Sequence, residues 1–254
     1  MPTPRLVAFD LDDTLAPSKT PIDTRMGELL IALAARVEVA IISGGQLQQF
    51  TTQVVDRLPA TTDRVRSALH LLPTCGTQYY RLAVDGVTTV YARTLTDDQK
   101  SRAFAAVEAE ARRLGLWESE TWGEILEDRG SQITFSALGQ SAPVAAKMAW
   151  DPTGSKKNAL RQAVAALLPD LEVRSGGSTS VDITERGIDK AYGMIQLVEQ
   201  TGIPLDDMLF VGDRLDPDGN DYPVLAMGVA CQAVEGWEDT AAFLERLLPT
   251  LPER

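Results

Sequence analysis

The chain has 254 residues, of which 44% are hydrophobic and 24% are charged, so it has the composition of a globular protein and is long enough for one large core or two smaller ones. Its formal net charge of −12 argues against general binding to nucleic acid or to anionic membranes, because both would be repelled. A small anionic substrate would have to be bound at a local positive site.

The histidine and cysteine counts narrow the classes further. The single histidine, His70, excludes zinc sites built on several histidines, and we expect it to be a structural or surface residue. Cys75 and Cys231 are too few for a disulfide framework and indicate a reducing compartment. We therefore expect a cytoplasmic protein without a signal or membrane-spanning segment.

The chain begins with alternating strand and helix patterns. Residues 5–9 and 37–42 are short apolar runs typical of buried strands, and residues 22–35 between them have the apolar spacing of a helix. A second helix is predicted from Gly45 to about Leu58. This order favours a parallel sheet flanked by helices.

The middle of the chain has a different pattern. Two strand-like runs, 79–82 and 87–91, flank Asp85 and Gly86 and predict a hairpin. Thr96 has the spacing of a capping box that opens a helix to about residue 114. Further strands are predicted at 124–126, 133–136, 171–174 and 178–184, and one more helix at 155–168. We interpret this part as a separate α+β unit, an antiparallel sheet with two helices.

The last part returns to the first pattern. Its predicted elements are a helix at 189–201, strands at 208–211 and 227–230, and a helix at 237–248. We therefore predict an α/β protein with a Rossmann-like parallel-sheet core and an inserted α+β cap domain. The core is assigned to residues 1–83 and 187–254, and the cap to residues 84–186.

Three carboxylates follow the first predicted strand, those of Asp10, Asp12 and Asp13. In an open α/β sheet, ligands bind at the carboxyl ends of the strands. Asp10 and Asp12 alternate to similar sides, and two close carboxylates are relieved by a cation such as Mg²⁺, which prefers oxygen ligands. The alternative is a strand followed by a solvated acidic turn.

Two further segments are suited to binding a phosphate. Ser43, Gly44 and Gly45 follow the second predicted strand, and a hydroxyl with glycine N–H groups at a helix start can hold a phosphate. Lys190 lies in the first turn of a later helix, where a cation opposes the helix dipole unless a bound phosphate compensates it. The alternatives are an ordinary strand-to-helix turn and a surface lysine.

A fourth segment follows the strand predicted at residues 208–211. Asp213 can complete the magnesium shell that Asp10 begins, and Asp221 can hold water or orient the lysine. Asp216 and Asp218 in the same loop are expected to be solvated. The alternative for the whole loop is an acidic turn rich in proline and glycine.

Together, these four segments resemble the haloacid dehalogenase (HAD) superfamily, because an Asp-x-Asp-x-Thr motif, a serine, a lysine and a Gly-Asp motif occur in that order. The resemblance covers nearly the whole chain. It is to the subfamily with a large α/β cap, which includes sugar-phosphate phosphatases and eukaryotic-type phosphomannomutases. The segments most similar to the mutases are 176–182, 187–190 and Arg129 with the residues that follow it.

The resemblance implies that Asp10 attacks the phosphorus and forms an aspartyl phosphate, while Asp12 protonates the leaving oxygen and later deprotonates the acceptor. It implies a Mg²⁺ cofactor held by Asp10, the carbonyl of Asp12 and Asp213, with Asp221 beside it. The groups expected to hold the phosphoryl oxygens are Ser43, Gly44 and Lys190.

The cap, together with one residue of the first motif, is implied to select the substrate. Six positions are expected to contact it: Lys19, Arg129, Gln140, Lys147, Ser180 and Asp182. Three of them depart from the mutases, which have arginine at the positions of Lys19, Gln140 and Lys147. Lysine lacks the bidentate fork of arginine, and glutamine carries no charge.

A weaker set of cations favours water as the acceptor, so we rank hydrolysis of a hexose phosphate monoester first. The alternative is an isomerase of the phosphomannomutase or phosphoglucomutase type, acting on hexose 1- and 6-phosphates. A hypothesis of another class is a regulatory protein that binds metal and phosphate without catalysis. The expected partner is a small sugar phosphate of unspecified identity, and a homodimer is left open.

Overall fold

The structure is a computed structural model and describes residues 3–83 and 86–253. The chain divides into two compact units, a core unit formed by Met1–Ala92 with Asp189–Arg254 and a cap unit formed by Arg93–Ile188. Both ends of the chain thus contribute to the core. The unit boundaries lie later than the predicted 84 and 186, because the second hairpin strand belongs to the core sheet.

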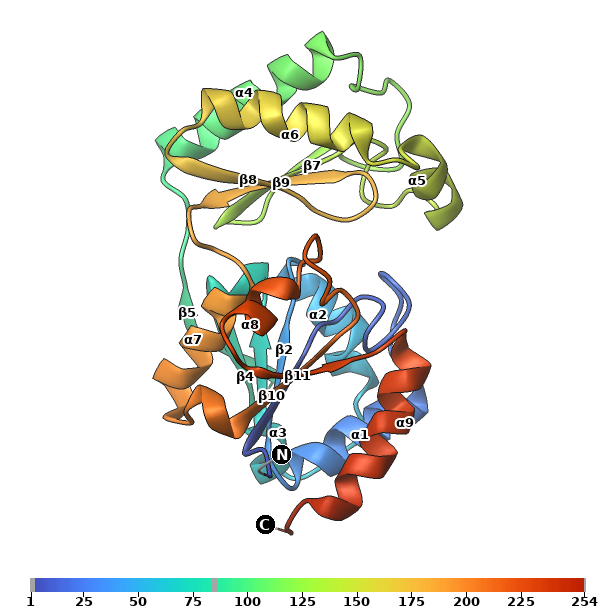
Figure 1. Ribbon diagram of the computed structural model, residues 1–254, viewed down its shortest axis with the longest axis vertical. Helices are drawn as coiled ribbons and strands as arrows, with labels where there is room; N and C mark the ends of the chain where they lie inside the picture. The colour runs from blue at the N-terminus through green and yellow to red at the C-terminus, as the bar shows by residue number, and fades with distance from the viewer. Residues whose placement is uncertain (1–2, 84–85, 254) are drawn as a thin grey trace. The chain divides into compact units, whose positions relative to one another are not determined.

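The core unit contains a seven-stranded sheet (Figure 1). In spatial order its strands are β11 (Ala230–Ala233), β10 (Met208–Gly212), β1 (Leu6–Phe9), β2 (Glu38–Ile42), β3 (Leu69–Leu72), β4 (Gln78–Ala83) and β5 (Gly86–Ala92). The strands from β11 to β3 are parallel, and β4 and β5 are antiparallel. The predicted Rossmann-like α/β core is therefore confirmed.

Helices cover both faces of this sheet. They are α1 (Thr24–Ala34), α2 (Leu47–Gln53), α3 (Asp63–Arg66), α7 (Lys190–Thr201), α8 (Tyr222–Ala226) and α9 (Trp237–Leu247), with short 3₁₀ helices η1 (Val55–Arg57), η2 (Thr74–Gly76), η3 (Leu205–Asp207) and η4 (Leu248–Thr250). Val7 and Phe9 of β1 pack in a hydrophobic core with α1 and α9. Leu6 and Ala8 pack on the opposite face with α7 and α8. Because β1 is covered on both faces, it is apolar throughout.

The cap unit is an antiparallel sheet with helices α4 (Asp97–Arg113), α5 (Val144–Trp150) and α6 (Ser155–Leu167). Its strands in spatial order are β6 (Leu126–Asp128), β7 (Gln132–Ser136), β9 (Ser180–Glu185) and β8 (Leu171–Ser175). The predicted capping box at α4 is present, since the side chain of Thr96 accepts from the amide of Gln99 and the side chain of Gln99 accepts from the amide of Thr96.

The two faces of the cap sheet differ in polarity because side chains alternate along each strand. Ile133 and Phe135 of β7 and Val181 and Ile183 of β9 share one hydrophobic core with α4 and α6, which lie over this face (Figure 1). The residues between them on β7 and β9 are polar and form the opposite face. We call this second face the polar face of the cap sheet.

Several predicted elements differ from the structure. Met227 follows α8 rather than beginning a strand, and β11 starts at Ala230, so the strand predicted at 227–230 was placed too early. Helix α2 ends at Gln53 instead of continuing to about residue 58, and α5 was not predicted. The two strands of the predicted hairpin pair with Ala83 opposite Gly86, whereas Asp85 lies outside the described residues.

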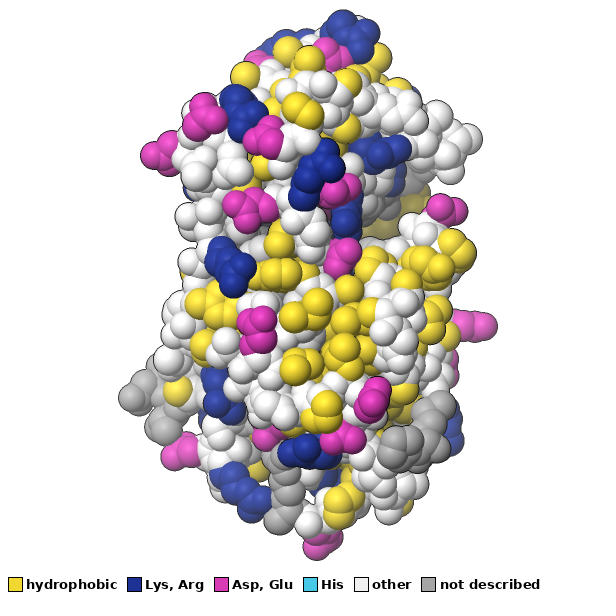
Figure 2. All heavy atoms as spheres, turned by 60° about the vertical axis from the view of Figure 1, so that its left-hand side comes forward, with side chains coloured by type: hydrophobic (Ala, Val, Ile, Leu, Met, Phe, Trp, Pro, Cys, Tyr) yellow, Lys and Arg dark blue, Asp and Glu magenta, His cyan; other side chains and the backbone are white. Residues whose placement is uncertain are grey.

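The surface carries charges of both signs. Figure 2 shows acidic and basic side chains interspersed on one face, with hydrophobic side chains gathered over the core unit. The large hydrophobic side chains most exposed on that unit are Val90, Ile195, Tyr222 and Leu225. Within the part of the chain that the structure describes, every helix is too short or too polar to cross a bilayer.

Candidate active site

The parallel strands bring the predicted segments to one edge of the core sheet. Phe9 lies opposite Val211 of β10, and β2 runs parallel on the other side of β1. Asp10, Ser43 and Asp213 follow these three strands directly and emerge at their carboxyl ends. The amide of Asp10 donates to the carbonyl of Val211 at 3.0 Å, which fixes the backbone at the predicted nucleophile.

Lys190 joins two of the predicted carboxylates. Its Nζ lies 2.6 Å from Asp10 Oδ1 and 2.5 Å from Asp221 Oδ1. All three side chains are buried. Asp189 caps α7 by accepting from the amide of Tyr192 at 3.1 Å, which fixes the helix start and therefore the base of the lysine side chain.

The protonation of this cluster is set mainly by burial. Burial raises the pKa of Asp10 to about 8, a rise that Asp221 supports and Lys190 opposes. For Lys190 burial acts against the charge, but the attraction of Asp10 and Asp221 outweighs it and raises the pKa of the ammonium. Burial also raises the pKa of Asp213, again with a contribution from Asp221. An additional cation would favour the ionised carboxylates and lower the pKa of Asp10.

The same carboxylates form a donor set suited to a divalent cation. Asp10, Asp213 and Asp221 each offer an oxygen, and these oxygens lie within 4.8 Å of one another. Thr14 Oγ1 donates to Asp213 Oδ1 at 3.2 Å and orients that side chain. Asp221 accepts through both oxygens, Oδ1 from Lys190 and Oδ2 from the amide of Arg214, whereas Asp10 meets Lys190 through Oδ1. Asp10 and Asp213 are therefore better disposed to contact a metal directly. Hard oxygen donors of this kind fit Mg²⁺.

Asp12 has different partners. Its carboxylate accepts from Gln49 Nε2 at 3.1 Å and from the amide of Lys19 at 2.7 Å, and it is absent from the acidic cluster of the described residues. The Asp12 side chain therefore lies outside the cluster, where it is available for the predicted proton transfer. Only the backbone carbonyl of Asp12 is left for the implied metal contact. Gln49 was missed in the sequence; its one signal is its place in the first turn after the Ser43 loop.

The loop Ser43–Gly45 follows β2 at the carboxyl edge of the sheet and leads into α2. The hydroxyl of Ser43 is buried and accepts from the amide of Gly45 at 3.2 Å. A Cβ placed on Gly44 would meet no described atom within 4 Å, so there is space beside this backbone for a ligand. The arrangement is compatible with the predicted role in holding phosphoryl oxygens.

The polar face of the cap sheet collects the predicted substrate residues of the cap. Asp182 lies opposite Thr134, whose hydroxyl donates to Asp182 Oδ1 at 2.8 Å, and Ser180 lies opposite Ser136. The side chain of Gln140 donates to Ser136 Oγ at 2.7 Å. These positions therefore form a connected polar surface on β7 and β9.

The cap cations reach the same surface. Lys147 Nζ donates to the carbonyl of Gln140 at 2.9 Å. Arg129 Nη2 lies 2.7 Å from Glu127 Oε2, and Glu127 lies opposite Thr134 and so shares its face. All five predicted cap residues are thus connected to the polar face. The sequence predicted these residues one by one, but not the face that they share.

Comparison with known proteins agrees with this arrangement. The model of the family "Eukaryotic phosphomannomutase" matches residues 26–250. The chain belongs to the eukaryotic phosphomannomutase family. A Caenorhabditis elegans member described as "Probable phosphomannomutase" is 27% identical over 97% of this chain and 96% of its own length. A Saccharomyces cerevisiae phosphomannomutase is 24% identical over 95% and 93%.

Solved structures share the fold of this phosphomannomutase-family chain. An IMP-nucleotidase of Plasmodium falciparum superposes with a TM-score of 0.73 at 13% identity, over 96% of this chain and 70% of that one. A haloacid dehalogenase-like hydrolase of Bacteroides thetaiotaomicron has a TM-score of 0.64 at 15% identity, over 96% and 100%. The family match and the relatives, together with this shared fold, confirm the predicted HAD superfamily membership, and the family match identifies an enzyme of phosphoryl transfer.

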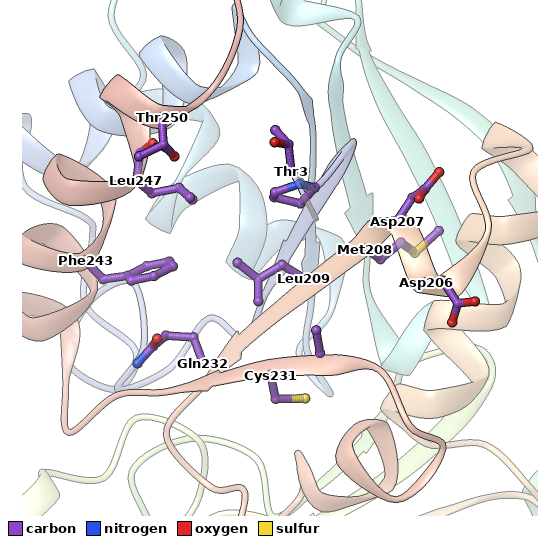
Figure 3. A pocket seen from close by; sticks show the side chains of 12 residues that line it. Thr3, Asp206, Asp207, Met208, Leu209, Cys231, Gln232, Phe243, Leu247 and Thr250 are labelled. Carbon is purple, nitrogen blue, oxygen red and sulfur yellow. The ribbon is translucent and has the colours of Figure 1, made fainter. Parts of the chain in front are cut away.

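A pocket of about 370 Å³ lies in the core unit, away from the acidic cluster (Figure 3). Leu209 near the start of β10, Cys231 of β11, and Phe243 and Leu247 of α9 line it. Asp213 follows the other end of β10, so this pocket is distinct from the acidic cluster. Burial raises the pKa of Cys231 to about 11, which keeps its thiol protonated at neutral pH.

Proposed function

We propose that this protein is a phosphohexomutase that interconverts hexose 1- and 6-phosphates through an aspartyl phosphate on Asp10. The observation that carries the proposal is the family match, which spans both units, together with relatives named phosphomannomutase that align along nearly the whole chain. The sequence alone ranked hydrolysis first, but the comparisons support the mutase alternative better.

The site residues are suited to the roles that the proposal gives them. Asp10 is the nucleophile, and Lys190 holds its carboxylate and the incoming phosphoryl oxygens. Ser43 contributes a hydroxyl to the same oxygens. Mg²⁺, held by Asp10 and Asp213, would neutralise charge on the transferring group.

Asp12 is the proposed general acid and base. Its carboxylate is held by Gln49 and by the backbone of Lys19, so it stands two residues from the nucleophile without competing for Lys190. In this position it gives a proton to the leaving sugar oxygen and takes one from the next acceptor hydroxyl. The cap polar face would hold the sugar and its second phosphate, chiefly through Arg129, Lys147 and Asp182.

Hydrolysis remains the second candidate because Gln140 and Lys147 stand where the mutases have arginine. A weaker grip on the distal phosphate would let water replace the sugar as acceptor. We keep the cytoplasm as the proposed compartment, since neither Cys75 nor Cys231 is in a disulfide.

The test supplies mannose 1-phosphate with Mg²⁺ and a trace of glucose 1,6-bisphosphate, and measures hexose 6-phosphate and inorganic phosphate together. We expect hexose 6-phosphate to form faster than phosphate is released. Asp10→Asn is expected to lower the rate by about 10³-fold or more, because no phosphoenzyme forms. Asp216→Asn, which changes an exposed carboxylate paired with Arg214, is the matched control and should retain activity. Phosphate release that outpaces isomerisation would favour the phosphatase.

A further inference from the structure

The turn η2, which follows β3, has an unusual backbone. Thr74 has φ 47° and Cys75 has φ 56° and ψ 27°, and Gly76 follows with φ 90°. Left-handed conformations are rare for residues other than glycine, and a β-branched threonine is a particular outlier. Such residues persist where the surroundings over-determine them, and they cluster at functional sites.

The left-handed backbone directs two successive amides at the Ser43 loop. The amide of Cys75 donates to the carbonyl of Ser43 at 2.9 Å, and the amide of Thr74 donates to the carbonyl of Gly45 at 2.9 Å. Both ends of the short loop that carries the Ser43 hydroxyl are therefore bonded to η2. A relaxed extended backbone at these two residues would not present both amides to the same loop.

The other side of the turn lies against α7. A Cβ on Gly76 would stand 2.7 Å from the Cα of Gly193, and a Cβ on Gly193 would stand 3.1 Å from the carbonyl oxygen of Cys75. Gly193 lies nearly one helical turn beyond Lys190, on the same face of α7. This close backbone contact sets the distance of α7 from the sheet, and with it the position from which the lysine reaches Asp10.

A pair of buried hydroxyls holds the turn in this form. Thr77 Oγ1 donates to the carbonyl of Thr74 at 2.9 Å. Its oxygen lies 2.6 Å from Thr74 Oγ1, so the two hydroxyls share a hydrogen bond. Both side chains are buried.

We propose that η2 is a positioning element for phosphoryl transfer, in which the Thr74–Thr77 hydroxyl pair fixes the spacing between the Ser43 loop and Lys190. The inference rests on the proposed function, because it assigns Ser43 and Lys190 to the transferring phosphoryl group. Neither Thr74 nor Thr77 has to touch the substrate; they act through the loop and the helix. Asp10 and Asp213 follow β1 and β10, so the backbone that carries these carboxylates does not depend on this turn, although Lys190 contacts Asp10.

The test compares Thr77→Val with Thr240→Val. Thr240 is a matched control, because it is also buried and its hydroxyl donates to a backbone carbonyl, that of Gly236, in α9. For Thr77→Val we expect kcat to fall about tenfold or more, since small misplacements of positioning groups are costly. Inhibition by orthovanadate, which imitates the transferring phosphoryl group, should weaken about as much. The Mg²⁺ concentration for half-maximal activity should change less than the vanadate inhibition, because the backbones of Asp10 and Asp213 follow other strands. Thr240→Val should alter none of the three.

Equal losses in both variants, or unchanged vanadate inhibition in Thr77→Val, would overturn the proposal. Should Thr77→Val fail to fold, Thr77→Ala replaces it, because alanine removes the same hydroxyl without placing a second methyl group in the turn. Its kcat should fall while its melting temperature stays within about 4 °C of wild type; full activity would overturn the proposal. If the wild-type protein shows no phosphoryl transfer that depends on Asp10, the proposed function and this inference are refuted together. If the wild type is active and the variants are unaffected, this inference alone is refuted.

Discussion

Lys190 is the residue on which the electrostatic balance of the site depends. It neutralises two buried carboxylates, those of Asp10 and Asp221, and the attraction is mutual, since burial alone would favour the neutral form of every member. One lysine leaves a third carboxylate, Asp213, without a full countercharge, and burial, with a contribution from Asp221, raises the pKa of Asp213. Without a cation, the raised pKa of Asp10 favours a proton on its carboxylate at neutral pH, and a bound divalent cation would displace that proton.

His70 makes stability depend on pH through an interaction outside this cluster. Its Nε2 lies 2.9 Å from Glu38 Oε2 and its Nδ1 lies 2.5 Å from the hydroxyl of Tyr79. His70 is thus a buried structural residue, which is one of the two roles expected from the sequence. Burial lowers the pKa of His70 from 6.5, and Glu38 offsets burial only in part. The unfolded chain therefore binds a proton on this residue before the folded protein does, and stability falls as pH drops below about 6.5.

We expect the free energy of unfolding of the wild type to fall between pH 7.5 and 5.5 by more than that of His70→Gln, which has no group that titrates there. The difference has an upper limit of about 1.4 kcal/mol for each pH unit below the unfolded pKa. Urea titrations with saturating Mg²⁺, which keeps Asp10 ionised in both proteins, measure it. Parallel pH profiles would show that the histidine is not the responsible group.

The site could be predicted from the sequence where it depends on strand order, and not where it depends on local turns. Asp10, Ser43 and Asp213 each follow a buried strand, and parallel strands must bring such residues to one edge. Gln49, the side-chain partner of Asp12, was missed because the direction of the Asp12 side chain depends on the backbones of Asp13 and Lys19. Both are left-handed, and the sequence gives no sign of this at residues other than glycine.

Among the elements, the long periodic helices and the buried strands predicted at 5–9, 37–42 and 208–211 were predicted well, whereas others of the short elements were not. The four apolar or small residues at 227–230 match a buried strand, but Pro223 lies in the first turn of the short helix α8, and Gly228, with φ 89°, ends the turn after it. Strand β11 therefore starts only at Ala230. Helix α5 lies between Pro143 and Asp151 and is too short to show a helical period.

The polar face of the cap sheet offers a test of substrate selection at the scale of one element. Gln140 follows β7, donates to Ser136 and accepts from Lys147, so it occupies the centre of the polar connections. Gln140→Arg would add a permanent cation there without removing the lysine. An arginine can hold a phosphate with two parallel hydrogen bonds, worth about 1.5–3 kcal/mol.

We therefore expect Gln140→Arg to raise the ratio of isomerisation to phosphate release by about tenfold or more, through tighter binding of hexose bisphosphate. The rates of hexose 6-phosphate and phosphate formation measure the ratio. Gln162→Arg, the same change at an exposed position of α6 on the helical side of the cap, should leave the ratio unchanged. An equal change in both variants would point to net charge rather than to the polar face.

At the scale of the whole molecule, the two units depend differently on the chain. The cap unit is one continuous segment with its own hydrophobic core, which includes Ile133, Val107 and Leu160. The core unit needs both ends of the chain, because β10, from the second segment, pairs directly with β1, from the first. The first segment alone would expose an apolar edge strand along β1.

This topology predicts opposite behaviour of two isolated fragments of similar length. Residues 93–188 retain every strand of the cap sheet and both large helices, so this fragment should unfold cooperatively in urea, with the fluorescence of Trp117 and Trp150 and the far-ultraviolet circular dichroism changing together. Residues 1–92 lack β10, β11, α7, α8 and α9, and should show no cooperative transition. The sheet loses one neighbour of β1, the helices α7 and α8 of one face, and α9, which packs with α1 on the other face. Cooperative unfolding of the second fragment, or its absence from the first, would mean that the cores are not independent in the way that the packing indicates.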